Sequence, residues 1–187
     1  MNDTSIEYLN RFERRQQDEL LQMCTQYKAL DGTLLTCEDI DTHWKKIAPE
    51  YMADAVGLVQ EYPTVSLAWA AYLGMAIAVG WDTDWAKCSE TPNNTYYGEQ
   101  GFDDMDEHIV QNILNIPLSD QRAKDIENLI RRLAQTAITL IRREQIEPQS
   151  PMAFHVFARS VKVMFKMGAA IELKKRGYKF EQVFVGN

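Results

Sequence analysis

The chain has 187 residues and a formal net charge of −7, with 45% hydrophobic and 25% charged residues. A chain of this length folds as one domain whose core needs neither disulfide bonds nor a structural metal, and its three cysteines form no CxxC pair. The negative charge disfavours nucleic-acid binding. The polar first residues lack the apolar region of a signal peptide, so we expect a cytoplasmic protein.

Helical patterning dominates the first third of the chain. Thr4 and Glu7 have the spacing of a capping box, and apolar residues then recur at helical intervals. A short second helix is expected to begin at Thr36 and to include the apolar residues Ile40, Trp44 and Ile47. Pro49 suits the first turn of a third helix, which we expect to end at Pro63. The sequence therefore predicts three helices in this part of the chain.

Residues 64–81 have the sequence TVSLAWAAYLGMAIAVGW and contain no charged side chain. On a helix, small residues recur every four positions on one face, at Ser66, Ala70, Gly74 and Ala78. Large residues recur beside them, at Val65, Trp69, Leu73, Ile77 and Trp81. The flanks lack the basic residues that anchor a membrane helix, so we expect a central helix near 63–81 that is surrounded by other helices. A small-molecule ligand in the row of small residues stays open as an alternative.

A long polar stretch follows, in which we expect an irregular loop at residues 82–102. Loops of this length are uncommon in compact domains and are often functional. The aromatic side chains of this loop are costly to leave in water, among them Trp85, Tyr96 and Tyr97. We therefore expect them to fold back on the bundle or to contact a partner, which makes them candidate interaction residues.

The same stretch contains a weak candidate for a metal site. Asp104 and His108 lie four residues apart on one helical face. Asp82 and Asp84 could complete an oxygen-rich site for Mg²⁺ or Mn²⁺. Acidic residues in the first turn of a helix also stabilise its positive end without any metal. We favour this second interpretation and predict neither a metal nor a cofactor.

Three further helices are expected after this stretch. Asp103 caps the first and Ser119 caps the second. Ser150 begins a long C-terminal helix near 150–176, and Gly177 provides its left-handed cap. Each of these helices has apolar residues at helical spacing on one face.

A C-terminal arm at 178–187 follows the last helix. No run of alternating apolar and polar residues elsewhere is long enough to predict a strand. The chain is therefore predicted to form one all-α domain over residues 1–187, a bundle of about six to seven helices.

Charge is distributed unevenly along the chain. Residues 1–120 contain 7 basic and 21 acidic residues, whereas residues 121–187 contain 13 and 6. The simpler interpretation is that the two parts pack together and neutralise each other. The alternative is a basic strip on the last helix, at Arg159, Lys162 and Lys166, that binds an acidic protein partner or a second copy of the chain.

No recognised catalytic pattern is present, because the chain has no HExxH, GxxxxGK, GxGxxG or GxSxG motif. We assign no catalytic residue and predict a non-enzymatic protein-interaction or regulatory module. Its expected partner is another protein or a second copy in a homodimer, with no nucleic-acid or membrane partner. The alternative is a small-molecule or divalent-metal-dependent enzyme that uses the acidic segment 82–108. An exposed apolar patch would favour the module, and a concave pocket with convergent polar groups would favour the enzyme.

Overall fold

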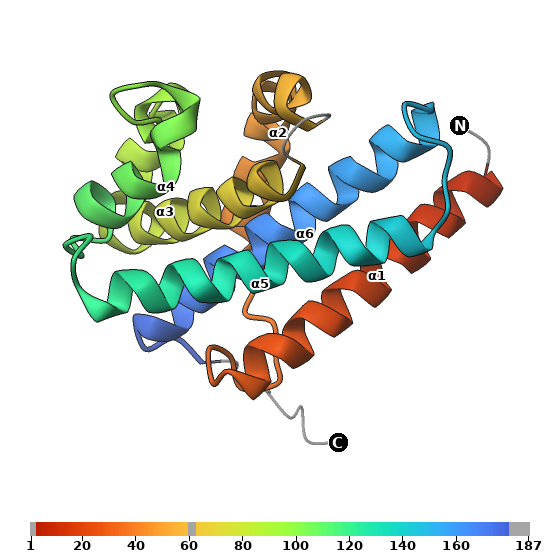
Figure 1. The fold of residues 1–187 in the computed structure, drawn as a ribbon. Coiled ribbons are helices and arrows are strands. Elements are labelled where there is room, and N and C mark those ends of the chain that lie inside the picture. The colour runs from red at the N-terminus through yellow and green to blue at the C-terminus, as the bar shows by residue number, and fades with distance from the viewer. Residues whose placement is uncertain (1–2, 60–62, 180–187) are drawn as a thin grey trace, which may run out of the picture.

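The computed structural model describes residues 3–59 and 63–179, and in these residues it contains helices and no strand (Figure 1). The α-helices are α1 Asp3–Gln26, α2 Glu38–Val59, α3 Pro63–Glu90, α4 Met105–His108, α5 Gln121–Arg143 and α6 Pro151–Lys175. The shorter turns are two of the 3₁₀ type, η1 Asn93–Tyr96 and η2 Phe102–Asp104, and one π-helical turn, η3 Ile109–Ile113. The predicted all-α bundle is confirmed.

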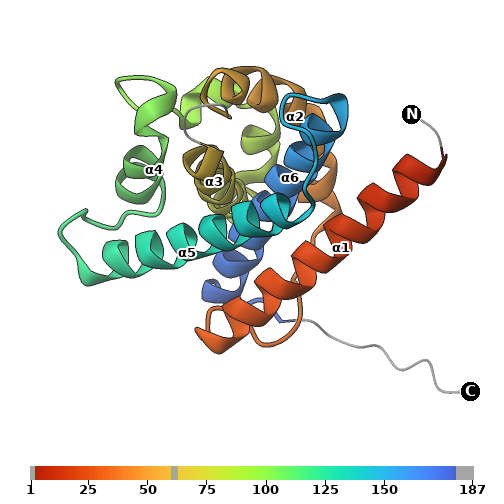
Figure 2. The ribbon, with the colours of Figure 1, turned by 45° about the vertical axis from the view of Figure 1, so that its right-hand side comes forward.

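The centre of the bundle is the contact between α3 and α6, which lie side by side (Figure 2). Their backbones touch at two glycines. A Cβ atom on Gly74 would lie 2.0 Å from the carbonyl oxygen of Phe165. A Cβ atom on Gly168 would lie 1.8 Å from the carbonyl oxygen of Ala71. The expected central helix is confirmed, and the long C-terminal helix crosses it at a distance that only glycine permits.

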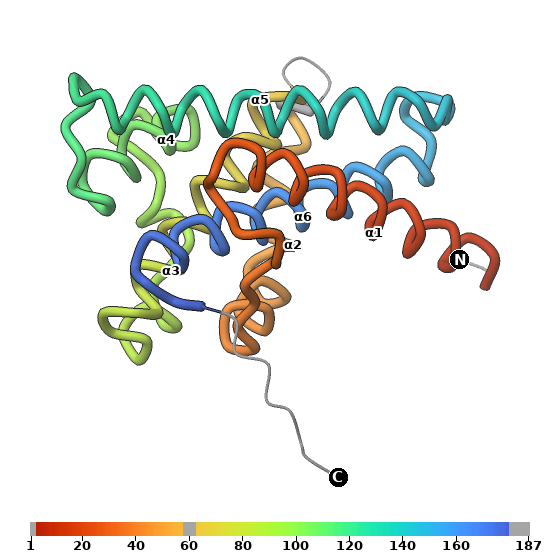
Figure 3. The backbone as a smooth tube through the Cα atoms, turned by 90° about the horizontal axis from the view of Figure 1, so that it is seen from below, coloured from red at the N-terminus to blue at the C-terminus, as the bar shows by residue number. Residues whose placement is uncertain are grey.

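The other long helices cover this pair. α1 and α5 pack against α6 and against each other, and α2 contacts both α3 and α6. α2 and α5 lie on opposite sides of the α3–α6 pair (Figure 3). Among the described residues, α3 is the one helix whose length and composition would allow it to cross a bilayer, and 67% of its most apolar 18-residue window is buried in the bundle.

α2 is one continuous helix, whereas the sequence predicted two helices that meet at Pro49. An internal proline costs about 3 kcal/mol, which favours a break. Trp44 and Tyr51 lie on either side of Pro49 and are 5% and 0% exposed. Trp44 stacks on Phe165 of α6, and the Tyr51 hydroxyl donates a hydrogen bond to the Ser66 carbonyl of α3. Burying two such side chains gains about 1.5–3 kcal/mol each, which offsets the proline.

α3 continues to Glu90, so the irregular stretch begins after it and not at residue 82 as predicted. The helix breaks at Asp84, whose φ of −158° and ψ of 84° are extended. The Asp84 carboxylate accepts a hydrogen bond from the backbone N–H three residues later, at 3.1 Å, as an N-cap residue does. Cys88 then packs over Gly80, where a Cβ would lie 2.3 Å from the Cys88 sulfur. Asp84 lies within the predicted loop, but in the structure it is the cap at which the helix restarts.

The caps predicted for the two helices before α6 were wrong. The N-cap position of α4 is Asp104, not Asp103, and its side chain makes no capping hydrogen bond. The N-cap of α5 is Asp120, not Ser119. The Asp120 carboxylate is favoured because it accepts hydrogen bonds from both the backbone N–H and the guanidinium of Arg122, at 2.9 and 2.7 Å.

Both ends of α6 form as predicted. Ser150 accepts a hydrogen bond from the backbone N–H of residue 153 at 3.1 Å, and Gly177 follows the last turn with a φ of +93°. Tyr178, the first residue of the predicted arm, packs its ring against Trp81 of α3 with centroids 5.3 Å apart. The arm from residue 180 onward lies outside the described residues.

Candidate functional site

The four metal candidates do not form one cluster, and each has its own partner. Asp84 caps the second part of α3, and Asp104 accepts a hydrogen bond from the backbone N–H of residue 100 at 3.2 Å. His108 is hydrogen-bonded through Nδ1 to the Asn112 side chain at 3.0 Å. Asp82 belongs to a network at the end of α6. In the part of the chain that the structure describes, no three histidine, cysteine or acidic side chains come together as metal ligands.

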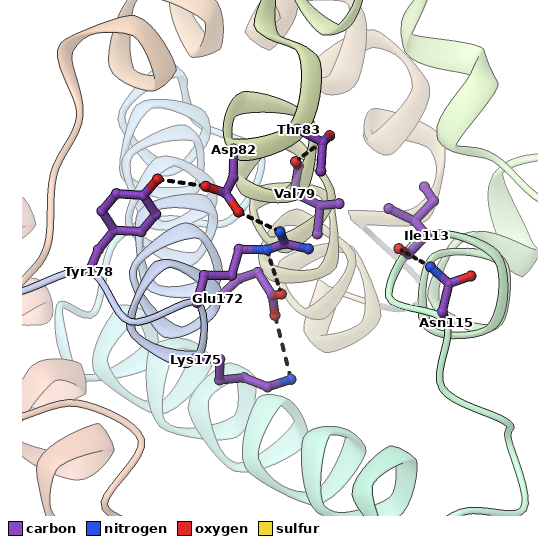
Figure 4. Close-up of polar contacts among 9 residues, drawn as sticks. Val79, Asp82, Thr83, Ile113, Asn115, Glu172, Lys175 and Tyr178 are labelled. Carbon is purple, nitrogen blue, oxygen red and sulfur yellow. Dashed lines mark hydrogen bonds and ion pairs between the residues drawn. The ribbon is translucent and has the colours of Figure 1, made fainter.

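Asp82 joins the end of α6 to α3 through a chain of polar contacts (Figure 4). Its carboxylate accepts hydrogen bonds from the Tyr178 hydroxyl at 2.5 Å and from the Arg176 guanidinium at 2.6 Å. Arg176 also binds Glu172 at 3.1 Å, and Lys175 lies 3.5 Å from the same carboxylate. The Tyr178 and Arg176 hydrogen bonds hold the pKa of Asp82 below its usual value. Asp82 therefore has a structural role, because it holds the C-terminal turn of α6 on α3.

The predicted basic strip on α6 faces acidic residues of the same chain. Glu13 of α1 accepts hydrogen bonds from both Arg159 and Lys162, the latter at 2.5 Å. Lys166 lies 3.5 Å from Asp41 of α2. Burial alone would raise the pKa of Glu13, but the hydrogen bonds from Lys162 and Arg159 lower it. At this contact the acidic and basic parts of the chain neutralise each other, as the simpler interpretation of the charge distribution expected.

The aromatic residues between α3 and α4 pack on the bundle. Phe102 contacts three aromatic rings at centroid distances of 4.8–5.6 Å, those of Tyr51, Trp69 and Tyr97. Tyr97 donates a hydrogen bond to Asp54 of α2, and burial together with that carboxylate raises its pKa. Tyr96 is 7% exposed. Of the two expectations for these side chains, folding back on the bundle holds for Tyr96 and Tyr97.

His43 and Trp85 form a contact between α2 and the last turns of α3. The two rings meet edge-on at a centroid distance of 5.4 Å, and His43 is 5% exposed. Its Nε2 atom has no hydrogen-bond partner among the described residues. Burial and the neighbouring Lys46 lower the pKa of His43, against an opposing effect of Glu90. The fold therefore keeps His43 neutral, and Trp85 serves to cover it.

A groove that the sequence did not reveal runs between α2 and α6, and we call it the α2–α6 groove. It has a volume of about 670 Å³ and a mostly apolar lining, formed by Trp44, Lys45, Ala48, Pro49, Met52, Ala53, Val56, Phe154, Ala158 and Lys162. Phe154 and Val56 are each 47% exposed, although both side chains are apolar. The groove escaped prediction because Pro49 suggested a helix boundary, and because Phe154 has the same helical spacing as the buried residues of α6.

A second hollow, of about 500 Å³, lies beside the break in α3, and we call it the kink hollow. It brings together two of the metal candidates, Asp84 and His108, with Cys88 and Tyr96. The Cys88 sulfur lies 3.5 Å from the Tyr96 hydroxyl, and burial raises the pKa of the Cys88 thiol. A raised pKa keeps Cys88 as a thiol at neutral pH, so it is not a nucleophilic thiolate.

The chain matches no protein-family model, no curated protein and no solved structure.

Proposed function

We propose that the protein is a non-enzymatic interaction module whose α2–α6 groove binds an amphipathic helix of a protein partner. The observation that carries this proposal is the pair of half-exposed apolar side chains, Phe154 and Val56, on a groove with an apolar lining. A contiguous exposed apolar patch marks an interaction site, whereas a single exposed apolar side chain does not. An amphipathic helix fits because its apolar residues at i, i+3, i+4 and i+7 enter such a groove.

Charge favours an acidic partner helix over a second copy of this chain. Among the described residues that line the groove, the charged side chains are two lysines, Lys45 and Lys162. Because Lys162 is already hydrogen-bonded to Glu13, it is Lys45 that would pair with glutamate or aspartate side chains flanking the apolar residues of a partner helix. In a symmetric dimer through the same groove, Lys45 of each copy would face the lining of the other copy's groove, whose described residues include no carboxylate.

The enzyme alternative has weaker support. The kink hollow gathers polar groups, but the thiol in its lining, Cys88, has a raised pKa. An enzyme that used this hollow for covalent catalysis would need the opposite shift, toward a thiolate at neutral pH. We therefore place the interaction function first.

A designed peptide tests the proposed function. The peptide is a fluorescently labelled helix of about four turns, with leucines at i, i+3, i+4 and i+7 and glutamates on its other faces. Fluorescence anisotropy measures its affinity for the protein. We expect the wild type to bind and Phe154→Asp to lose roughly tenfold or more in affinity, because the peptide would have to desolvate a carboxylate in an apolar groove.

Ile6→Asp is the matched control. Ile6 of α1 is 39% exposed and lies outside the groove lining, so this variant should bind the peptide as the wild type does. A peptide with lysines in place of glutamates should bind more weakly, and Lys45→Glu should reverse that preference. If the wild type and Phe154→Asp bound the peptide with equal affinity, the α2–α6 groove would not be the binding site. A wild-type dimer that Phe154→Asp dissociates in sedimentation would assign the groove to a second copy instead.

A further inference from the structure

Pro49 lies inside α2 and also in the lining of the α2–α6 groove. In an α-helix, each carbonyl oxygen accepts a hydrogen bond from the backbone N–H four residues later. Proline has no backbone N–H, so Pro49 cannot donate this hydrogen bond to the carbonyl of Lys45. Lys45 lines the same groove, and its carbonyl oxygen points along the helix toward the proline ring. The groove therefore contains a backbone acceptor that has lost its usual donor.

The Lys45 carbonyl has no substitute donor from a side chain. Among the described residues, no side chain forms a hydrogen bond with it. Pro49 is exposed, so solvent reaches this side of α2 in the free protein. A partner helix that filled the groove with apolar side chains alone would exclude solvent and leave the carbonyl unpaired, which weakens binding. The groove should therefore select a partner that brings a hydrogen-bond donor.

Tryptophan is the side chain that best combines such a donor with an apolar body. Its indole has one N–H donor and no acceptor, so one hydrogen bond satisfies it completely. Asparagine and glutamine would also bury a side-chain carbonyl without a partner in the apolar lining. Lysine and arginine would bring a positive charge close to Lys45 and Lys162. The groove volume of about 670 Å³ leaves room for a side chain as large as tryptophan.

We propose that the partner helix inserts a tryptophan into the α2–α6 groove, where the indole N–H donates a hydrogen bond to the backbone carbonyl of Lys45. This inference rests on the proposed function, because it names the side chain by which the groove recognises its partner. The apolar residues of the lining, among them the half-exposed ring of Phe154, cover the rest of the indole. Tryptophan is also among the residues that contribute most to binding in protein interfaces.

Two series of peptides test the donor. Each series starts from the acidic leucine peptide and replaces one leucine at a time, in the first with tryptophan and in the second with naphthylalanine. Naphthylalanine has a two-ring hydrocarbon of similar size and no N–H. Fluorescence anisotropy measures the affinity of each peptide for the wild type. At one position we expect the tryptophan peptide to bind about fivefold to tenfold more tightly, because its indole alone pairs with the Lys45 carbonyl.

Pro49→Ala tests the acceptor. It supplies the missing backbone N–H, which then bonds to the Lys45 carbonyl within the helix. Alanine is the most favourable residue inside a helix and proline the least, so the variant should stay folded. The preference for tryptophan over naphthylalanine should disappear, while the leucine peptide still binds. Val56→Ala is the matched control, because it also removes apolar atoms from the lining but keeps the proline, and it should keep the preference.

The outcomes separate this inference from the proposed function. If the tryptophan and naphthylalanine peptides bound the wild type equally at every position, the inference would be overturned and the proposed function would stand. A preference for tryptophan that is unchanged in Pro49→Ala would also overturn it, because the indole would then meet another group. If neither the leucine peptide nor any of its derivatives bound, the proposed function would fail and the inference with it.

Discussion

At the scale of single residues, His43 makes the stability of the fold depend on pH. Burial and Lys46 lower its pKa below the ordinary 6.5, so the unfolded chain binds a proton that the folded chain does not. Above about pH 6.5 both states are neutral at this residue. As the pH falls below that value, the free energy of unfolding should decrease, by at most about 1.4 kcal/mol per pH unit. Urea denaturation at about pH 7 and at about pH 5.5 measures the decrease.

His43→Gln removes the titrating group and should reduce this pH dependence. His155→Gln is the matched control, because His155 lies on α6 and not in the contact between α2 and α3. The wild type and the control should lose more stability than His43→Gln over the same pH interval. If His43→Gln lost as much stability as the wild type, the buried histidine would not be the source of the dependence.

At the scale of helices, the crossing of α3 and α6 depends on Gly74. A Cβ at this position would lie 2.0 Å from the Phe165 carbonyl oxygen, so Gly74→Ala must push the two helices apart. We expect a loss of about 1–3 kcal/mol in the free energy of unfolding. Gly57→Ala is the matched control, because nothing lies within 4 Å of a Cβ at this exposed position on α2. It should stabilise the protein by about 0.5–1 kcal/mol through helix propensity alone.

Urea denaturation of the two alanine variants at one pH compares them directly. We expect Gly74→Ala to lower the free energy of unfolding and Gly57→Ala to raise it, although the substitution is the same and both glycines lie in helices. A Gly74→Ala protein that is as stable as the wild type would mean that the crossing can relax without loss of packing.

Local signals predicted both ends of α6, although they misplaced the N-caps of α4 and α5 by one residue. The continuity of α2, which distant contacts decide, could not be predicted. Ser150 and Gly177 end α6 through a hydrogen bond and a backbone φ within the same turn. Pro49 was misjudged because the continuity of α2 depends on the burial of Trp44 and Tyr51 against helices far along the chain. No local pattern records that burial, so propensity gave the wrong boundary.

The candidate sites were harder to predict, because each combines segments that are remote in sequence. The α2–α6 groove pairs Val56 with Phe154, and the kink hollow joins Asp84 to His108. Arg159 and Lys162 suggested a free basic surface because Glu13, which neutralises them, lies 146 and 149 positions away. The positive charge of Arg159 and Lys162 does not indicate, in the sequence alone, that Glu13 neutralises these side chains.

At the scale of the whole molecule, Glu13 links the acidic first part of the chain to the basic last part. Glu13→Gln should lower the free energy of unfolding by about 1–3 kcal/mol, because two partly buried cations lose their charged acceptor. The pKa of Glu13 is lowered in the fold, so this stabilisation is present above about pH 4.5 and is lost as the pH falls through the lowered pKa. Urea denaturation at neutral pH measures the first effect, and repetition in acid measures the second.

Glu127→Gln is the matched control for this change. Glu127 pairs with Arg131 on the surface, and the two side chains are 56% and 51% exposed. An exposed pair of this kind contributes about 0.5 kcal/mol or less. Equal losses in the two variants would show that the Glu13 contact is no stronger than an ordinary surface pair.

The distance along the chain between Gly74 and Gly168 has a consequence during synthesis. α3 leaves the ribosome well before α6 exists, since roughly ninety residues separate the two glycines, and at about 5–20 residues per second this interval lasts about 5–20 s. Throughout it, the helix that is apolar enough to cross a bilayer lacks the surface that later covers it. A chaperone that binds nascent chains would therefore find an apolar target in α3, and the target closes only when the final helix emerges.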